Sequence, residues 1–455
     1  MREDTKSVAG RLTSLDATCV VIGAIVGVGI FFTPSQVAAQ TGSITLSLAA
    51  WGVGGLIALC GALTFAELGS RYCANGAQYA VLRDTYGTWL AFVFVFCNAT
   101  AVQAGAMGVI AIVCVNNLNL VVGGAEWSPS WVLVLSIALI GTLTLANLAG
   151  VKWGSRIQNF TVAAKLAALG LVIVLGIGWA PSPAPDVLAP TSSLAPSAWG
   201  FMAAIVPTIF AYGGWQHALW LAGEVRNPSK VVPRAIMIGV AIVIVTYLSA
   251  NWAYFRLLSL PEVASSKSLA ADALAKVTWF GAWGRWWIAL AVCISAFGVL
   301  NAQLLSGPRL IQGMARDFQL FSIFANCRGP SAAPVAAIVL LGCLSAGLLV
   351  LAGENGLGKL TTGVVFVDGI FFALTGLALI GVRRAAAGDI TPAFRTPWYP
   401  WIPLLFSAGM FGVVIGSFAN ADVRSSAVIG ILWILGAIAI YGVGLRLRKM
   451  GQTSK

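Results

Sequence analysis

Charged side chains are scarce in this chain of 455 residues, since 9% are Asp, Glu, Lys or Arg, against about 25% in an ordinary soluble domain. There is one histidine, and the eight cysteines form no C-x-x-C pair. No H-E-x-x-H sequence and no nucleotide-binding glycine loop is present. These absences argue against an enzyme, and neither a metal site nor a cofactor is predicted. We interpret the cysteines as small buried hydrophobic residues.

Hydrophobic residues make up 59% of the chain and the mean hydropathy is +0.89, which predicts an all-α polytopic membrane protein. A helix needs about 20 mostly apolar residues to cross a bilayer, and the chain divides into twelve such segments. Their approximate ranges are 17 to 40, 44 to 65, 88 to 115, 131 to 149, 158 to 180, 198 to 221, 233 to 255, 284 to 306, 334 to 352, 360 to 381, 399 to 419 and 426 to 446.

The net charge of +12 is explained by the orientation of the chain in the membrane. With the amino terminus in the cytoplasm, twenty of the 27 Lys and Arg residues fall on the cytoplasmic side and six on the outer side. This asymmetry is what the positive-inside rule predicts for an even number of spans. We therefore expect a multi-pass protein of the cell (inner) membrane with both termini cytoplasmic, embedded in lipid and without a nucleic-acid partner. No cleavable signal peptide is predicted.

Two of the predicted spans carry features that interrupt a helix. The first contains GAIVGVGIFFTP at 23 to 34, and the sixth contains Pro207 followed by FAYGGW at 210 to 215. Every backbone N–H and C=O must be paired in hydrocarbon, so either a neighbouring helix or a ligand must satisfy the interrupted turns. Glycines that merely permit close helix packing are the alternative.

The spacing of the two interruptions, five segments apart, is typical of inverted repeats of five helices whose unwound middles meet at the bilayer centre. Half-helix amino termini there attract an anion such as a carboxylate, and the freed carbonyls suit an ammonium group or a cation. We expect a tail at 1–16, repeats at 17–180 and 198–381, two added helices within 399–446 and a tail at 447–455. The residues predict a zwitterion or ion at mid-depth.

Four stretches resemble the amino acid/polyamine/organocation (APC) superfamily, and within it the L-type amino acid transporter branch and its bacterial relatives. They are GAIVGVGIFFTP at 23 to 34, TFAELGSRYCANGAQYAVLRDTYG at 64 to 87, GVKWGSRIQNFTVAAKLAAL at 150 to 169 and FAYGGWQHALWLAGEVRNPSKVVPRAI at 210 to 236. A weaker likeness covers 295 to 317. The resemblance implies a leucine-transporter-like 5+5 inverted repeat and secondary transport of amino acids by alternating access.

The resemblance also implies a substrate site. Gly27, Val28 and Gly29 match positions whose backbone N–H groups hold the substrate carboxylate. L-type relatives often carry a small hydroxyl residue where this chain has Val28, so recognition here depends more on backbone donors.

The substrate amine and the rest of the pocket are placed in the same way. Positions near the amine, with carbonyl acceptors, are matched by Ile25, Phe210 and Gly213. Phe210 also matches an aromatic residue that gates the outer side. The pocket lining after the sixth-span interruption is expected to include Trp215, Gln216 and His217.

Lys165 lies inside a predicted span, where a lysine costs about 2.5 to 3.5 kcal/mol on insertion scales. It could snorkel to the cytoplasmic interface. The small residues around it favour close helix approach instead, and it matches a family lysine that stands where sodium-coupled relatives hold a cation. We expect it to face spans 1 and 8 with Ser295 as a neighbour, to make transport independent of sodium, and to be a candidate proton carrier.

Several polar residues keep two interpretations. Asp368 is either a hydrogen-bonded carboxyl that joins helices, or a pocket wall or proton site. His217 is either a packing residue or part of the pocket. Glu67 and Glu224 resemble family positions that pair with arginines at the inner gate. Gln103 is either a polar group of the pocket or, as we expect, a residue that makes interhelical hydrogen bonds.

Sodium-independent exchange and proton-linked uptake of amino acids both remain open. A polyamine or cationic amino acid transporter is the runner-up, and a sensor that binds amino acids without moving them is a remote alternative. No partner subunit is evident, because the outer loop 116 to 130 lacks the cysteine by which heteromeric relatives are linked to one.

Overall fold

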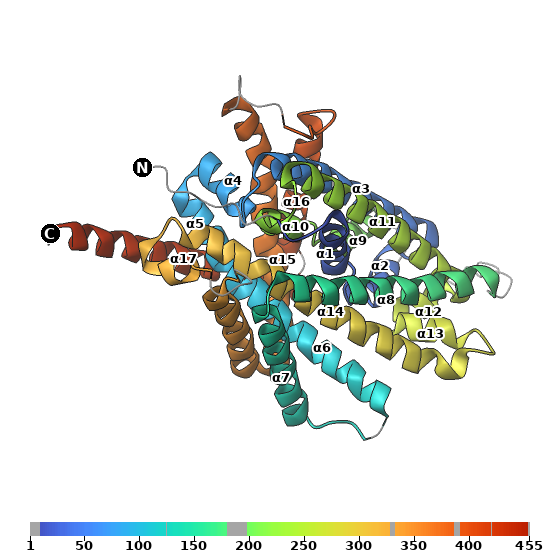
Figure 1. The fold of residues 1–455 in the computed structure, drawn as a ribbon. Helices are drawn as coiled ribbons and strands as arrows, with labels where there is room; N and C mark the ends of the chain where they lie inside the picture. The colour runs from blue at the N-terminus through green and yellow to red at the C-terminus, as the bar shows by residue number, and fades with distance from the viewer. Residues whose placement is uncertain are drawn as a thin grey trace.

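The structure is a computed structural model, and it describes the backbone at residues 10–123, 125–179, 198–327, 333–385, 392–419 and 421–453. Within these ranges the chain is helical and has no strand, and Leu12 and Val225 form an isolated parallel β-bridge. The prediction of an all-α protein is confirmed (Figure 1). The predicted linker at 181–197 lies outside the described residues.

The first predicted span is interrupted as expected. It consists of α1 (Ser14–Ile25), the 3-10 turn η1 (Gly29–Phe31) and α2 (Thr33–Thr41). A capping box starts α1, since the side chain of Thr13 accepts from the backbone N–H of Asp16, whose carboxylate accepts from the backbone N–H of Thr13. The chain leaves helical geometry after Ile25, and α2 restarts with a proline in its first turn, where a missing N–H costs little.

The sixth predicted span is interrupted too, and it consists of α9 (Ala198–Tyr212) and α10 (Gln216–Trp220). Between them the chain turns at Gly214, whose φ of 136° is rarely adopted by residues with a side chain. Paired glycines at 213 and 214 therefore end α9 without the steric cost that other residues would incur.

The other elements follow the predicted order. They are α3 (Ile44–Arg71), α4 (Ala77–Tyr86), α5 (Thr88–Cys97), the π-helical turn η2 (Asn98–Gln103), α6 (Ala104–Val122), α7 (Pro129–Leu148), α8 (Val151–Gly178), η3 (Ala222–Glu224), α11 (Pro228–Leu257), α12 (Leu260–Ser265), α13 (Leu269–Ala275), α14 (Gly281–Ala315), η4 (Gln319–Phe324), α15 (Val335–Ala385), α16 (Trp401–Ala419) and α17 (Ala421–Thr453). Eight helical runs in the described chain are long and apolar enough to cross a bilayer, and three shorter apolar helices accompany them.

Two boundaries differ from the sequence prediction. The predicted segments 334 to 352 and 360 to 381 form one helical run, α15, in place of two helices joined by a loop. No proline occurs between 335 and 385 to remove a backbone donor, so helical hydrogen bonding can continue through the polar residues between the segments. At the carboxyl end, α17 continues to Thr453 through most of the predicted tail at 447–455.

The short helix α1 lies in the middle of the bundle, in contact with α8, α10, α11 and α14 (Figure 1). Small residues allow the close approach. A Cβ atom on Gly239 of α11 would lie 2.6 Å from a side-chain atom of Val21, and one on Gly23 would lie 1.6 Å from the side-chain amide of Gln158 in α8. This packing sets the interrupted end of α1 inside the protein.

Candidate functional site

The two interruptions touch each other. A Cβ atom on Gly214 would lie 2.8 Å from both the carbonyl carbon of Ala24 and the amide nitrogen of Ile25. Only a residue without a side chain fits at this distance from another backbone. The end of α1 and the turn between α9 and α10 are therefore packed main chain against main chain.

Backbone donors are available at the interruption of the first span. Within the described chain, the N–H groups of Val28 and Gly29 donate to no acceptor, and both residues are partly accessible. The N–H of Gly27 donates instead to the carbonyl of Ile25 at 2.7 Å. Two adjacent unpaired donors can bind a carboxylate, whereas Gly27 would first have to release its present acceptor.

The carbonyl of Ile25 already has two donors. Besides the N–H of Gly27, it accepts from the hydroxyl of Tyr247 in α11 at 3.0 Å. Two bonds fill the acceptor capacity of a carbonyl oxygen. Near the second interruption, the carbonyl of Phe210 accepts from the N–H of Gly213 at 3.0 Å, and the carbonyl of Gly213 accepts no bond within the described chain.

Tyr247 was not singled out from the sequence. It lies fully buried in an aromatic cluster, with ring centroids 5.6 Å from Trp51 and 5.2 Å from Tyr212. A hydroxyl within an apolar segment was the available signal, because a buried tyrosine usually finds a hydrogen-bond partner.

Lys165 reaches the end of α1 from α8. Its fully buried ammonium group donates to the carbonyls of Gly23 at 3.0 Å and Val26 at 2.7 Å. The hydroxyl of Ser295 in α14 donates to the same Val26 carbonyl at 3.1 Å. The ammonium group thus faces α1 and not the water interface, and a positive charge at the carboxyl end of a helix is favoured by the unpaired carbonyls there.

The side chains that follow the second interruption are mostly enclosed. Trp215 is fully buried and packs against Phe65, Phe372 and Phe406, whereas Phe210 is 54% exposed. Gln216 is buried as well.

His217 has a protein partner. One ring nitrogen shares a short hydrogen bond with the hydroxyl of Ser306 in α14, and the ring lies 4.6 Å from that of Trp220. This arrangement favours the packing interpretation of His217 over a pocket role.

Asp368 of α15 is half-buried and hydrogen-bonded to the side chain of Asn98. Asn98 begins the π-helical turn η2, and such turns often occur at functional sites. Gln103 ends the same turn, and its side-chain oxygen has no hydrogen-bond partner in the described chain. Asn98 was missed from the sequence because an irregular turn leaves no periodic signal.

Comparison with known proteins identifies the family of the chain. A family model described as amino acid permease matches residues 12–444. The chain belongs to the amino acid permease family. This permease is 30% identical to the serine/threonine exchanger SteT of Bacillus subtilis over 98% of the chain and 99% of that protein.

More distant relatives cover the chain almost as fully. The permease is 27% identical to the mouse b(0,+)-type amino acid transporter 1 over 89% of the chain and 82% of that protein. It is 28% identical to the human large neutral amino acids transporter small subunit 2, over 95% of the chain and 79% of that protein. Together with the long apolar helices, the family shows that the permease is a multi-pass membrane protein.

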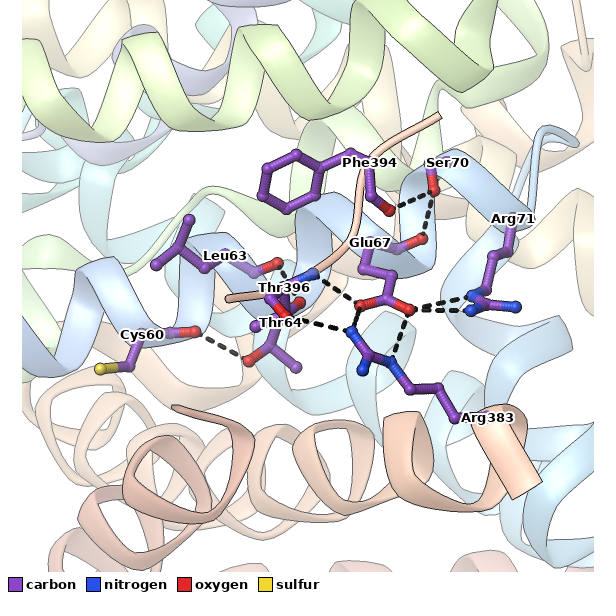
Figure 2. Close-up of polar contacts among 9 residues, drawn as sticks. All are labelled: Cys60, Leu63, Thr64, Glu67, Ser70, Arg71, Arg383, Phe394 and Thr396. Carbon is purple, nitrogen blue, oxygen red and sulfur yellow. Dashed lines mark hydrogen bonds and ion pairs between the residues drawn. The ribbon is translucent and has the colours of Figure 1, made fainter. Parts of the chain in front are cut away.

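Glu67 of the permease, expected to be a gate or fold element, joins three segments. Its carboxylate accepts from Arg71 one helical turn later at 2.9 Å, from Arg383 of α15 at 2.8 Å and from the backbone N–H of Thr396 at 2.8 Å. Figure 2 shows the carboxylate between the two guanidinium groups and the segment that carries Thr396. The segment between α15 and α16 is thereby fastened to α3.

Replacing Glu67 with glutamine is expected to lower the free energy of unfolding by about 2 to 4 kcal/mol, because it leaves two arginines without their buried counter-charge. The measurement is the thermal unfolding midpoint of the purified permease in detergent.

Glu262→Gln is the matched control. Glu262 pairs with Lys276 at 2.6 Å, but both side chains are more than 40% exposed, so the expected loss is below about 1 kcal/mol. Lys276 lowers the pKa of Glu262 to about 2, so the pair contributes above the carboxyl's ordinary pKa and is lost as the pH falls through about 2. Equal midpoints for the Glu67 variant and wild type would contradict the assigned role.

Glu224 also pairs with an arginine, Arg309 of α14, at 3.6 Å. The backbone carbonyl of Glu224 accepts from the N–H groups of Arg11 at 2.7 Å and Leu12 at 2.9 Å. The amino-terminal segment is therefore tied to the segment that follows α10. At the same end of α14, Arg83 donates to Asp317 at 2.7 Å, which raises the pKa of Arg83.

Proposed function

We propose that this permease exchanges small neutral L-amino acids across the cell membrane by alternating access, with the substrate held where the two interrupted spans touch. The observation that carries the proposal is the contact of Gly214 with the backbone of Ala24 and Ile25, beside the N–H groups of Val28 and Gly29, which have no acceptor among the described residues. A site made of main-chain groups recognises the part that all amino acids share.

In this proposal the substrate carboxylate binds the N–H groups of Val28 and Gly29, and Gly27 joins them when its turn opens. The ammonium group lies at the carbonyls of Gly213 and Phe210. Because Ile25 already accepts two hydrogen bonds, its carbonyl orients the turn in the state described here. The exposed ring of Phe210 closes the outer side over a bound substrate.

The architecture proposed with this mechanism has twelve spans, a 5+5 inverted repeat and both termini in the cytoplasm. The order α1 to α8 followed by α9 to α15, each set starting with an interrupted span, supports the repeat. The two apolar parts of α15, Val335–Leu351 and Phe366–Ala385, are proposed as the ninth and tenth spans.

Lys165 is proposed as a resident cation that makes external sodium unnecessary. Its ammonium group and the hydroxyl of Ser295 already occupy the carbonyls that a bound cation would need. Proton-linked uptake is the competing mode of coupling, with Lys165, Asp368 and His217 as candidate carriers.

A neutral substrate is favoured over a polyamine or cationic amino acid. The partly accessible side chain of Val28 provides apolar surface beside the break. The name of the Bacillus subtilis relative, a serine/threonine exchanger, agrees with a small substrate.

Counterflow in proteoliposomes tests the proposal. Vesicles that contain the purified permease and unlabelled serine are expected to accumulate labelled serine, threonine or alanine without sodium and without a pH gradient. Labelled arginine and putrescine are expected to give no uptake above that of protein-free vesicles.

The same assay separates the alternatives. Uptake that requires sodium would contradict the role of Lys165, and uptake that requires a pH gradient would indicate proton symport. Binding of serine to the purified protein without counterflow would indicate a sensor. Because the vesicles contain one kind of chain, activity there also shows that no partner subunit is needed.

A further inference from the structure

A second candidate site lies at the end of the molecule that carries the amino-terminal segment. It is a cavity of about 440 Å³ lined by Gly10, Arg11, Lys152, Arg226 and Asn227. Three of these five residues carry a positive charge and none carries a negative one. None of them belongs to the substrate site proposed above.

The backbone around the cavity is fixed by the pairing of two segments. The N–H of Arg11 donates to the carbonyl of Glu224 at 2.7 Å, and the N–H of Arg226 donates to that of Leu12 at 3.0 Å. The Nε of Arg226 donates to the carbonyl of Gly10 at 3.1 Å. The cations therefore sit on ordered main chain, and the cavity is a defined feature of the fold.

Donors remain for a ligand. Within the described chain, the terminal guanidinium nitrogens of Arg226 and the ammonium group of Lys152 make no hydrogen bond, and both side chains are exposed. Among the described residues, the acid that interacts with Arg226 is Asp16, whose carboxylate already accepts from Thr13 and from Asn159 at 2.7 Å. The described lining of the cavity therefore carries more positive than negative charge.

Two long helices begin at the cavity. Lys152 is the second residue of α8, and Asn227 is the N-cap of α11 and makes no side-chain cap. Helix amino termini carry unpaired N–H groups and partial positive charge. Added to three cationic side chains, they suit a compact anion with several acceptor oxygens, such as a phosphate group.

The surface beside the cavity points to a lipid. Trp153, which follows Lys152, is 56% exposed, and Phe160 two turns along α8 is 71% exposed. Arg156 stacks over the ring of Trp153 at 5.2 Å. Exposed tryptophan beside basic residues is typical of the level of the lipid headgroups. We propose that this cavity binds the phosphate of an anionic phospholipid headgroup, a site independent of the substrate proposal.

Native mass spectrometry of the purified permease in detergent tests this, with phosphatidylglycerol and phosphatidylcholine as probes at equal concentration. Wild type is expected to retain phosphatidylglycerol preferentially. The double variant Lys152→Gln/Arg226→Gln is expected to bind it about 30-fold more weakly, since each basic residue near a membrane surface contributes about 1 kcal/mol, or about fivefold.

Lys230→Gln is the matched control, because Lys230 is an exposed cation in the first turn of α11 that does not line the cavity. The Lys230→Gln variant is expected to bind phosphatidylglycerol as strongly as wild type does. Lys152→Gln alone, which removes no hydrogen bond of the side chain, is expected to give an intermediate loss, and a monodisperse gel-filtration peak confirms folding.

Two results would overturn the proposal. Equal retention of phosphatidylglycerol by wild type and the double variant would show that the cavity is not the binding site. Displacement of the lipid by excess inorganic phosphate, with phosphate itself bound by wild type and not by the double variant, would assign the cavity to a free phosphate ion.

Discussion

Gly214→Ala is expected to reduce amino acid counterflow by at least about 100-fold, which corresponds to about 2.7 kcal/mol. The added methyl group would lie 2.8 Å from backbone atoms of Ala24 and Ile25, and neither backbone can move aside independently. The φ of 136° adds about 1 to 3 kcal/mol of strain for any residue with a Cβ atom. The two interruptions would have to separate, and with them the groups that hold the substrate.

The measurement is initial counterflow per monodisperse protein, together with the unfolding midpoint. Gly141→Ala in α7 is the control, because a Cβ atom there meets nothing within 4 Å and the residue has no positive φ. That variant is expected to behave as wild type. A Gly214 variant with wild-type counterflow would show that contact between the interruptions is not needed for transport.

Lys165→Met is expected to abolish measurable exchange, again a loss of about 100-fold or more. Methionine fills a similar volume but cannot donate, so the carbonyl of Gly23 loses its cationic donor and that of Val26 keeps only the hydroxyl of Ser295. An unsatisfied buried carbonyl costs about 1 to 3 kcal/mol. The end of α1 would lose the geometry that leaves the N–H groups of Val28 and Gly29 available.

Ser295→Ala is compared with Lys165→Met because a smaller loss of exchange activity is expected. It removes one neutral hydrogen bond from Val26 and leaves the ammonium group in place, so a loss of about fivefold is expected, near 1 kcal/mol. Both variants are measured by counterflow with and without sodium. Activity of Lys165→Met close to that of wild type in sodium-free buffer would remove the argument for a resident cation.

Local sequence predicted the interruptions because glycine and proline act on their own backbone. The local sequence alone is enough to recognise Gly27, Gly29 and the pair at 213 and 214 as positions where a helix can break. Both breaks occur where expected. The helix boundaries within 335–385 were harder to predict from the sequence. Residues between two apolar runs can stay helical when no proline removes a backbone hydrogen-bond donor.

The contacts of the site depended on partners far apart in the chain. His217 and Trp215 follow the break as predicted, yet their side chains are directed into the protein, one onto Ser306 and one among phenylalanines. Nothing local to either residue encodes that direction. Asn98 and Tyr247 were missed for the same reason, since each matters through a group on another helix.

The sequence by itself determined that the chain is a polytopic helical membrane protein with two interrupted spans, because hydropathy and backbone preference are properties of neighbouring residues. The tertiary structure alone decided which freed backbone groups are still available. Among the described residues, side chains from α11, α8 and α14 donate hydrogen bonds to the carbonyls of Ile25 and Val26, whereas the N–H groups of Val28 and Gly29 have no acceptor. A hydrogen bond is satisfied by whatever lies within about 3 Å, and only the packing of distant helices sets that neighbour.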